Sequence, residues 1–312
     1  MPSANADTIQ RRDQRTGLYL LIPAVIMLLL VFAYPIGRSL WLSFFDQNLA
    51  TGLEPVFAGL NNYARIAGDG RFWQSFWITT RFTVITVVLE LILGMGIALV
   101  LNQAFRGRNL VRTIAILPWA LPTALIALGW TWIFNDQYGI VNDILLRLGL
   151  IQQGINWLGS PFTANLALIV ADVWKTTPFI SILLLAGLQS IPGDLYEAHA
   201  LEGATPWQSF YRITLPLLMP QIIIAMLFRF AQAFGIFDLM AVMTGGGPGG
   251  STEVVSLYIY ATAMRYLDFG YSAAMVVVTF LLLIIAVLIC AYFISLSSKN
   301  RGRGEGWLGV GC

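Results

Sequence analysis

Six long apolar stretches constrain this chain more than any other feature of its sequence. They cover residues 18–45, 72–101, 111–134, 162–189, 217–243 and 271–295. A helix needs roughly 20 apolar residues to cross the hydrocarbon core of a bilayer, and each stretch is long enough to do so. The stretches are continuous and do not alternate polar with apolar residues, which favours helices over the strands of a membrane barrel. The sequence therefore predicts an all-α polytopic membrane protein with six transmembrane helices.

The composition excludes several other classes of protein. Hydrophobic residues make up 57% of the 312 residues and charged residues only 11%, whereas about 25% of the residues of a soluble domain are charged. Such a chain cannot cover itself with a polar surface, which argues against a nucleic-acid binder, a disordered protein and a disulfide-built secreted module. Cys290 lies within an apolar stretch and Cys312 is the last residue. The two cysteines lack metal-ligand spacing, so no metal site is predicted.

The basic residues predict the orientation of the helices. Lys and Arg near helix ends are retained on the cytoplasmic face of a membrane. With both termini in the cytoplasm, the basic residues outside the spans gather on that face. The inside residues are then Arg11, Arg12, Arg15, Arg106, Arg108, Arg112, Arg212, Lys299, Arg301 and Arg303. The outside residues are Arg65, Arg71, Arg147 and Arg265.

The chain is then expected to form one transmembrane domain in the cytoplasmic (plasma) membrane. Residues 1–17 would be a cytoplasmic N-terminal segment, residues 18–296 the six-helix domain and residues 297–312 a cytoplasmic tail. The first apolar stretch follows several arginines, as in a signal peptide, but it is too long and lacks a small-residue cleavage site. We therefore expect this stretch to persist as the first transmembrane helix.

The cytoplasmic loop at residues 190–216 carries helix signals of its own. Asp194 can cap a helix, and Glu197 three residues later completes a capping-box pattern. Gly203 can end that helix. Thr205 can cap a second helix, with proline at its first position and glutamine at its third. Two short helices joined by a glycine bend are therefore expected on the cytoplasmic face.

The second of these short helices would carry an aromatic face. Trp207, Phe210 and Tyr211 are three and four residues apart, so they fall on one side of a helix. Such a face can lie in the lipid headgroup region, or it can dock into a groove of another protein. The residue pattern by itself leaves both interpretations open.

The same loop resembles a signature of transport proteins. The residues that carry the resemblance are Glu197, Ala198, Gly203, Ile213, Leu215 and Pro216. Their spacing reproduces the EAA signature of ABC-importer permeases, which reads Glu-Ala-Ala, three residues, Gly, nine residues and Ile-x-Leu-Pro. His199, the sole histidine of the chain, stands where the second alanine is usual. One imidazole without partners forms neither a metal site nor a proton relay, so we interpret His199 as a tolerated substitution.

Further segments resemble the permeases of carbohydrate importers. Residues 172–179 look like the helix that precedes the EAA loop in these proteins, and the Thr-Gly-Gly-Gly-Pro sequence at 244–248 is similar to a turn of MalF-type maltose permease subunits. More narrowly, the chain resembles the MalF-type permeases of mycobacterial trehalose importers. The resemblance implies a permease subunit that imports a sugar, such as the disaccharides trehalose or maltose, by alternating access.

The resemblance also implies a division of labour among several subunits. The partners would be a second, MalG-type permease, an ATPase dimer that docks on residues 190–216, and an extracytoplasmic solute-binding lipoprotein that docks on the outer loops. No GxxxxGKS/T phosphate loop occurs in the sequence. ATP and Mg²⁺ are therefore expected on the ATPase, with no cofactor and no enzymatic activity in this chain. The residues implied to couple to the ATPase are Glu197, Ala198, Gly203, Trp207, Ile213, Leu215 and Pro216.

Seven ionisable residues lie within the predicted spans. They are Arg38, Arg81, Glu90, Asp172, Lys175, Arg229 and Asp238. A charge in the middle of the bilayer costs at least about 2.5–3.5 kcal/mol, so such residues usually face the interior of a helix bundle or a wet cavity. Asp172 and Lys175 are three residues apart on one helix, so they can pair with each other.

A sugar pathway is the alternative interpretation of these residues. Asp172, Thr176 and Phe179 recur at helical spacing along the fourth span, and Arg229 and Gln232 share a stripe of the fifth. A sugar site needs hydrogen-bond partners for hydroxyl groups and an aromatic face for the C–H surface, and the two stripes offer both. By position they also resemble the sugar-contacting faces of maltose permeases. Internal charge pairing and a sugar pathway both remain open.

Three competing functions are weighed against a sugar-importer permease. The first is an ABC permease for another solute, such as a polyol, glycerol phosphate or an oligosaccharide. The second is a stand-alone secondary transporter, which would favour a symmetric pair of broken helices that the sequence does not suggest. The third is a multipass membrane enzyme, which would need convergent acid, base or metal-binding residues.

Overall fold

The computed structural model describes residues 19–52 and 54–304, and the chain divides into two compact units. Of the described residues, unit 1 comprises 19–52, 54–68 and 259–282, and unit 2 comprises 69–258 and 283–304. The predicted N-terminal segment 1–17 and the end of the predicted tail, with Cys312, lie outside the described residues. Each unit is described by itself.

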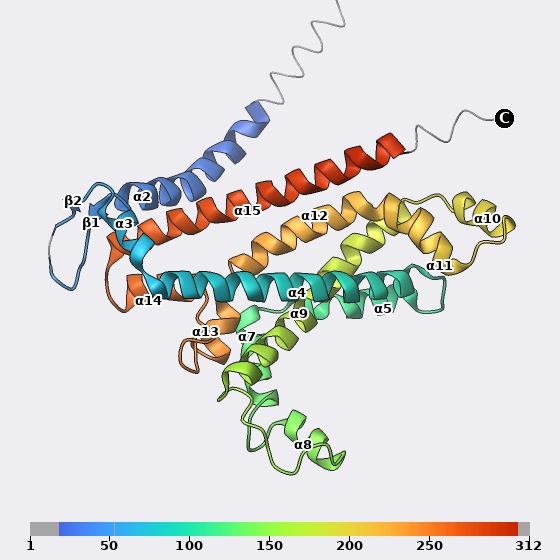
Figure 1. Cartoon of the computed structure of the whole chain (residues 1–312), viewed down its shortest axis with the longest axis horizontal. Coiled ribbons are helices and arrows are strands. Elements are labelled where there is room, and N and C mark those ends of the chain that lie inside the picture. Colours follow the sequence, from blue (N-terminus) through green and yellow to red (C-terminus); the bar gives the residue numbers. More distant parts are fainter. Residues whose placement is uncertain (1–18, 53, 305–312) are drawn as a thin grey trace, which may run out of the picture. The chain divides into compact units, whose positions relative to one another are not determined.

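Long apolar helices make up most of the structure (Figure 1). Five of them are long and apolar enough to cross a membrane. They are Tyr19–Leu42, Gly70–Asn102 (α4), Pro161–Gln189 (α9), Pro206–Phe234 and Phe269–Ile289, which is the first part of α15 (Phe269–Gly304). A sixth candidate is the helix pair Arg108–Ala120 and Thr123–Ile133, which is bent by 91°. The prediction of an all-α polytopic membrane protein is confirmed.

The third predicted span, at 111–134, is not one continuous helix. Its parts are α5 (Arg108–Ala115), α6 (Leu117–Ala120) and α7 (Thr123–Ile133). The backbone is extended at Leu121, with φ −77° and ψ 145°, and Pro122 follows directly. The helix breaks here because a residue before proline is pushed out of the helical region and proline has no N–H to donate.

The fifth predicted span, at 217–243, differs from the structure at both ends. One continuous helix runs over Pro206–Phe234. Its parts are α11 (Pro206–Ser209), the π-helical turn η2 (Phe210–Thr214) and α12 (Leu215–Phe234). The second short helix expected in the loop is therefore the beginning of this span, and α13 (Asp238–Met243) is a separate short helix. Pro216 lies in the first turn of α12, where proline is tolerated, so it does not interrupt the helix.

Unit 2 is built on close packing among α4, α9 and α12. A Cβ atom added to Gly94 of α4 would lie 2.7 Å from Ile180 Cγ2 of α9, and one added to Gly187 of α9 would lie 2.5 Å from Leu218 Cδ1 of α12. Small residues at such positions let membrane helices approach closely. The buried side chains around these contacts are Ala98, Leu101, Ile180, Leu184, Leu185, Leu188, Leu218 and Ala225. The three helices therefore lie close enough for side chains of different helices to contact one another inside the unit.

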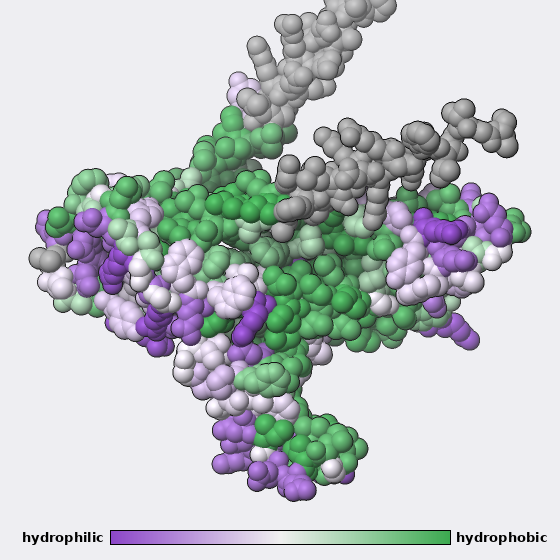
Figure 2. Space-filling model, viewed as in Figure 1, coloured by the Kyte–Doolittle hydropathy of each residue, from purple (hydrophilic) through white to green (hydrophobic). Residues whose placement is uncertain are grey.

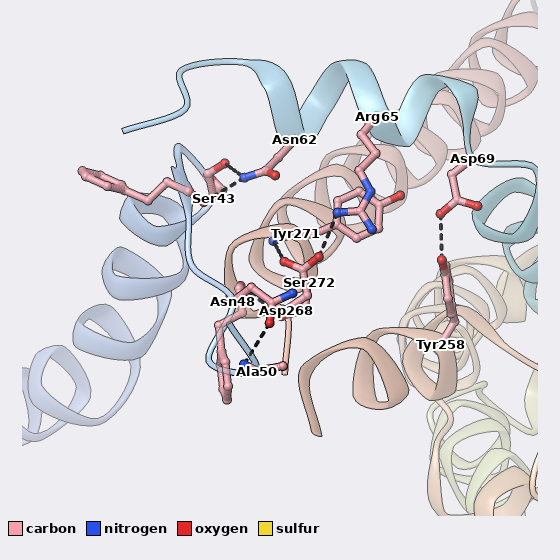
Figure 3. Close-up of polar contacts among 12 residues, drawn as sticks. Ser43, Asn48, Ala50, Asn62, Arg65, Asp69, Tyr258, Asp268, Tyr271 and Ser272 are labelled. Atoms are coloured by element: carbon pink, nitrogen blue, oxygen red, sulfur yellow. Dashed lines mark hydrogen bonds and ion pairs between the residues drawn. The ribbon is translucent and has the colours of Figure 1, made fainter. Parts of the chain in front are cut away.

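Polar contacts hold the start of α4 in place at one end of unit 2. Asp69 Oδ1 accepts hydrogen bonds from the backbone N–H groups of Arg71 and Phe72, at 2.9 and 3.2 Å. Asp69 Oδ2 accepts another from the Tyr258 hydroxyl at 2.8 Å (Figure 3). Arg71 pairs with Glu253 at 2.7 Å. The start of α4 is thereby tied to residues just before and within α14 (Val255–Met264).

The loop between α7 and α9 contains a further helix, α8 (Ile140–Arg147). Asn142 is buried and organises this loop. Its Nδ2 donates to the carbonyl oxygens of Asp136 and Ile155 at 3.2 and 2.9 Å. Its Oδ1 accepts from Ile155 N–H and from Trp157 Nε1 at 3.2 and 2.9 Å. One amide thus holds both ends of the loop together, which the sequence pattern did not indicate.

Unit 1 contains a short polar assembly beyond its first helix. Strands β1 (Phe45–Asp46) and β2 (Val56–Phe57) pair antiparallel, and α3 (Asn61–Gly68) follows. From α3, Asn62 Nδ2 donates to the carbonyl oxygen of Ser43 at 3.0 Å, and Arg65 pairs with Asp268 at 2.8 Å (Figure 3).

The first apolar helix packs differently from the others. Its last parts are η1 (Leu29–Ala33) and α2 (Tyr34–Leu42), and neither buries a side chain. Within the described chain, none of its apolar residues is buried.

Candidate functional site

The loop at 190–216 forms one end of unit 2, beside the ends of α4 and α9 (Figure 1). Its first helix is α10 (Asp194–Leu201). Gly203 follows this helix with φ +81°, a left-handed conformation that glycine adopts without strain, so the predicted glycine bend is confirmed. The predicted cap at Asp194 is wrong, because Gly193 precedes the helix without a side-chain cap and Asp194 already lies in the first turn.

The predicted capping box at the second helix is confirmed. The Thr205 hydroxyl accepts a hydrogen bond from Gln208 N–H at 3.3 Å, and Gln208 Oε1 accepts one from Thr205 N–H at 2.8 Å. This reciprocal pair satisfies two N–H groups that a helix start would otherwise leave open. The bend and the start of the long helix are therefore both defined by local sequence.

Helix α10 is largely exposed, and only Tyr196 and His199 on one side of it are half-buried. None of its residues is buried, and Leu201 at its end is 90% exposed. Glu197 and Ala198 of the EAA signature are exposed as well. A helix of one or two turns is marginal in water unless packing or side-chain contacts support it. Figure 2 shows hydrophilic side chains gathered at this end of unit 2.

Two side-chain hydrogen bonds hold α10 against the helix that follows. His199 Nδ1 lies 2.9 Å from Ser209 Oγ, and the Tyr196 hydroxyl lies 2.9 Å from Thr214 Oγ1. The premise that His199 has no partner is therefore wrong, whereas its interpretation as a tolerated substitution stays a prediction. Sequence reasoning missed the partner because the glycine bend, and not the residue spacing, brings Ser209 to it.

The aromatic residues of the loop lie together as predicted. The Trp207 ring lies 5.7 Å from Phe210 in a stacked arrangement and 4.8 Å from Tyr211 edge-on. Trp207 is 66% exposed. At the end of the signature, Ile213 and Leu215 are half-buried and Pro216 is exposed. The structure thus brings all the signature residues to one end of unit 2.

A buried ion cluster lies between the three central helices. Arg229 Nε of α12 lies 2.6 Å from Glu90 Oε2 of α4, and Arg229 Nη2 lies 2.6 Å from Asp172 Oδ2 of α9. The Thr176 hydroxyl donates to Glu90 Oε1 at 2.6 Å. The three charged side chains are at most 6% exposed. Charges this deep in a membrane protein are tolerated only when they are paired and hydrogen-bonded.

This cluster corrects the predicted charge pairing. Asp172 pairs with Arg229 on a different helix, and not with Lys175 on its own helix. Glu90 was recognised as a charge inside a span but not as a member of a site. Its membership could not be inferred from spacing, because Glu90 and Arg229 are 139 positions apart in the chain.

The remaining predicted pathway residues are distributed over different surfaces. Phe179 is half-buried and stacks on Trp119, with ring centroids 4.9 Å apart, and it also lies 5.3 Å from Phe228. Gln232 is exposed, whereas Arg229 three residues earlier is buried. The structure therefore brings together Asp172, Thr176 and Arg229, but it does not bring Gln232 to them. Within the described part of the chain, no three His, Cys, Asp or Glu side chains are grouped as a metal site.

A family model and individual relatives of known name agree on the family to which this chain is similar. A sequence model described as "Binding-protein-dependent transport system inner membrane component" matches residues 90–296. The trehalose/maltose transport system permease protein MalF of Thermococcus litoralis is 40% identical over 88% of this chain and 92% of its own length. The trehalose transport system permease protein SugA of Mycobacterium tuberculosis is 36% identical over 86% of this chain and 85% of its own length.

A third relative carries a different solute in its name. The sulfoquinovosyl glycerol transport system permease protein SmoG of Agrobacterium fabrum is 42% identical over 86% of this chain and 87% of its own length. Among solved structures, a chain of a bacterial ABC transporter that imports the acidic polysaccharide alginate superposes with a TM-score of 0.77. It covers 92% of this chain and 98% of its own at 22% identity, so it supports the fold alone.

Proposed function

Because the chain belongs to the family of binding-protein-dependent transport system inner membrane components, we propose that it is a permease subunit of an ATP-driven sugar importer. The solute is a disaccharide such as trehalose or maltose, in line with the names of two relatives. The observation that carries the proposal is the α10–α11 end of unit 2, where the exposed helix α10 presents Glu197 and Ala198 of the EAA signature.

The proposed assembly contains four kinds of subunit. An ATPase dimer docks on the 190–216 loop through Glu197, Ala198, Gly203, Trp207, Ile213, Leu215 and Pro216. It binds ATP and Mg²⁺, since this sequence lacks a phosphate-binding loop. A second, MalG-type permease completes the pathway, and a solute-binding lipoprotein docks on the outer loops. The first helix, which buries no side chain within the described chain, is available to the second permease or to lipid.

The proposed orientation follows the basic residues. Both termini and the α10–α11 loop lie in the cytoplasm, where Arg106, Arg108, Arg112 and Arg212 also lie. ATP closes the ATPase dimer, which moves the two docking loops of the paired permeases towards each other. The helices then rock, and the pathway opens outward to the binding protein. Hydrolysis reverses the movement.

The proposed sugar pathway runs beside the central helices of unit 2. It includes Asp172, Thr176, Phe179, Arg229 and Gln232, with Phe179 offering an aromatic surface next to Trp119. The carboxylates already bind the guanidinium in this conformation, so a sugar reaches them only when the helices separate. The relative named for sulfoquinovosyl glycerol supports a second candidate, which is a permease for another glycoside.

Reconstitution in liposomes tests the proposed function. We expect uptake of labelled trehalose or maltose only when the chain is combined with its second permease, its ATPase, ATP inside the vesicles and the binding protein outside. An ATPase inactivated in its phosphate-binding loop serves as the control. Sulfoquinovosyl glycerol, supplied in parallel, distinguishes the two solute candidates. Uptake by this chain alone would contradict the proposal.

A further inference from the structure

The two hydrogen bonds between α10 and the following span form a regular pattern. On α10, Tyr196 and His199 are three residues apart, so they lie on the same side of that helix. On the following helix, their partners Ser209 and Thr214 are five residues apart. In an α-helix, with 3.6 residues per turn, residues five apart differ by about 140° around the axis and cannot face the same neighbour.

The π-helical turn η2 resolves this mismatch. It covers Phe210–Thr214, and Leu215 N–H bonds to the carbonyl oxygen of Phe210, five residues back. A turn closed by i→i+5 hydrogen bonds is wider than an α-helical turn and brings residues five apart close to alignment. Ser209 and Thr214 therefore face α10 together. Isolated π turns of this kind are frequent at functional sites.

We propose that His199–Ser209 and Tyr196–Thr214 form a two-point brace, which fixes α10 to the Pro206–Phe234 helix so that the two move as one body. The inference rests on the proposed function, because it assigns the brace to the transmission of force from the docking surface to the span. A single contact would leave α10 free to pivot at the glycine bend after Leu201. Two contacts at successive turns remove that freedom.

The brace gives His199 a role that alanine cannot fill. Where the EAA signature has its second alanine, the side chain has no atom that reaches Ser209. His199 is half-buried and Glu197 beside it is exposed, so His199 acts by positioning the docking surface and not by contacting the ATPase. His199 and Ser209 are therefore positioning residues in this account.

A double-mutant cycle in the reconstituted importer tests the brace. The measured quantity is solute transported per ATP hydrolysed, with the amount of ATPase that copurifies recorded for each variant. We expect His199→Ala and Ser209→Ala each to lower this ratio about fivefold, which corresponds to about 1 kcal/mol and to one neutral hydrogen bond. The double variant should fall no further. His199→Asn, whose amide occupies the place of Nδ1, should stay within about twofold of the unmodified chain, since it keeps a hydrogen bond that is worth about 1 kcal/mol.

Thr205→Ala is the matched control in the same bend. It breaks the capping box but neither contact of the brace, so the transport ratio should be unchanged even if the protein is slightly less stable. Three results would overturn the brace. The transport ratio could fall equally in His199→Ala and His199→Asn, the losses of the single variants could multiply in the double variant, or Thr205→Ala could lower the ratio by a similar factor. Ser209→Ala removes one oxygen atom from a half-buried site, so it keeps the test open should His199→Ala fold poorly.

Assays of the unmodified chain distinguish a failure of the proposed function from a failure of the brace. If it shows no ATP-dependent uptake with its partners, the proposed function fails. If it couples uptake to ATP hydrolysis and the His199 and Ser209 variants couple equally well, only the brace fails.

Discussion

Replacing Arg229 with methionine is expected to prevent stable accumulation of the protein in the membrane. The substitution leaves Glu90 and Asp172 buried, 0% and 6% exposed, without the guanidinium that both carboxylates contact. Removing one partner of a buried ion pair costs about 3–5 kcal/mol, because the remaining charge stays uncompensated in a medium of low polarity. Here two carboxylates lose the same partner, and they also repel each other.

The measurements for this prediction are membrane abundance and the thermal unfolding midpoint in detergent. Arg81→Met is the matched control, because Arg81 is an arginine on the same helix as Glu90 but is exposed and donates one hydrogen bond to Asn165 Oδ1, at 3.1 Å, without an ion pair. The Arg81→Met variant should change neither membrane abundance nor the unfolding midpoint appreciably. The triple variant Glu90→Gln, Asp172→Asn, Arg229→Met removes all three charges and should recover much of the lost stability. An Arg229→Met protein as abundant and as stable as the unmodified chain would contradict the structural role of the cluster.

Two substitutions in the 190–216 loop are expected to stop uptake without preventing insertion. Glu197→Lys reverses a charge on a helix that buries no residue, and Gly203→Leu places a side chain at φ +81°. A left-handed conformation costs a non-glycine residue roughly 1–2 kcal/mol, so the bend should shift. We expect uptake to fall about tenfold or more, equivalent to about 1.4 kcal/mol of lost docking energy, while membrane abundance stays the same.

The assay pairs ATP-dependent uptake with ATP hydrolysis in the same vesicles. Hydrolysis by the ATPase should lose its dependence on the solute-loaded binding protein in both variants. Glu54→Lys makes the same charge reversal at an exposed position of an outer loop, so it controls for the effect of the charge change on membrane abundance, which should be unchanged. Full uptake by Glu197→Lys and Gly203→Leu would remove the loop from the mechanism.

The membrane helices could be predicted because their signal is local. An apolar run of sufficient length indicates a span whatever it packs against. The breaks were harder to predict, because apolar residues continue through Leu121 and Pro122 although the backbone turns there. The same limit applies to the fifth span, whose helix begins at Pro206 and ends at Phe234. Hydropathy indicates whether a segment lies in lipid or in water, but it does not indicate where the backbone hydrogen bonds of a helix are interrupted.

The structure of the 190–216 loop was predicted in part for a related reason. The capping box at Thr205 and the bend at Gly203 depend on neighbouring residues, and both are present. Asp194 offered an equally good local signal for a cap, but the helix already begins at Asp194 and Gly193 takes the cap position. The contacts of His199 with Ser209 and of Arg229 with Glu90 depend on folding around a bend or between helices. No pattern of spacing in one sequence indicates such pairs.

Photo-crosslinking from the docking loop tests the central claim most directly. Leu201 at the end of α10 is 90% exposed, so a benzoylphenylalanine placed there should not disturb the fold. In the assembled importer we expect a crosslink between this position and the ATPase subunit. Tyr138, which is 69% exposed in the loop between α7 and α9, serves as the control and should give no crosslink to the ATPase. A Leu201 position that crosslinks only to lipid, in an importer that transports normally, would contradict the account.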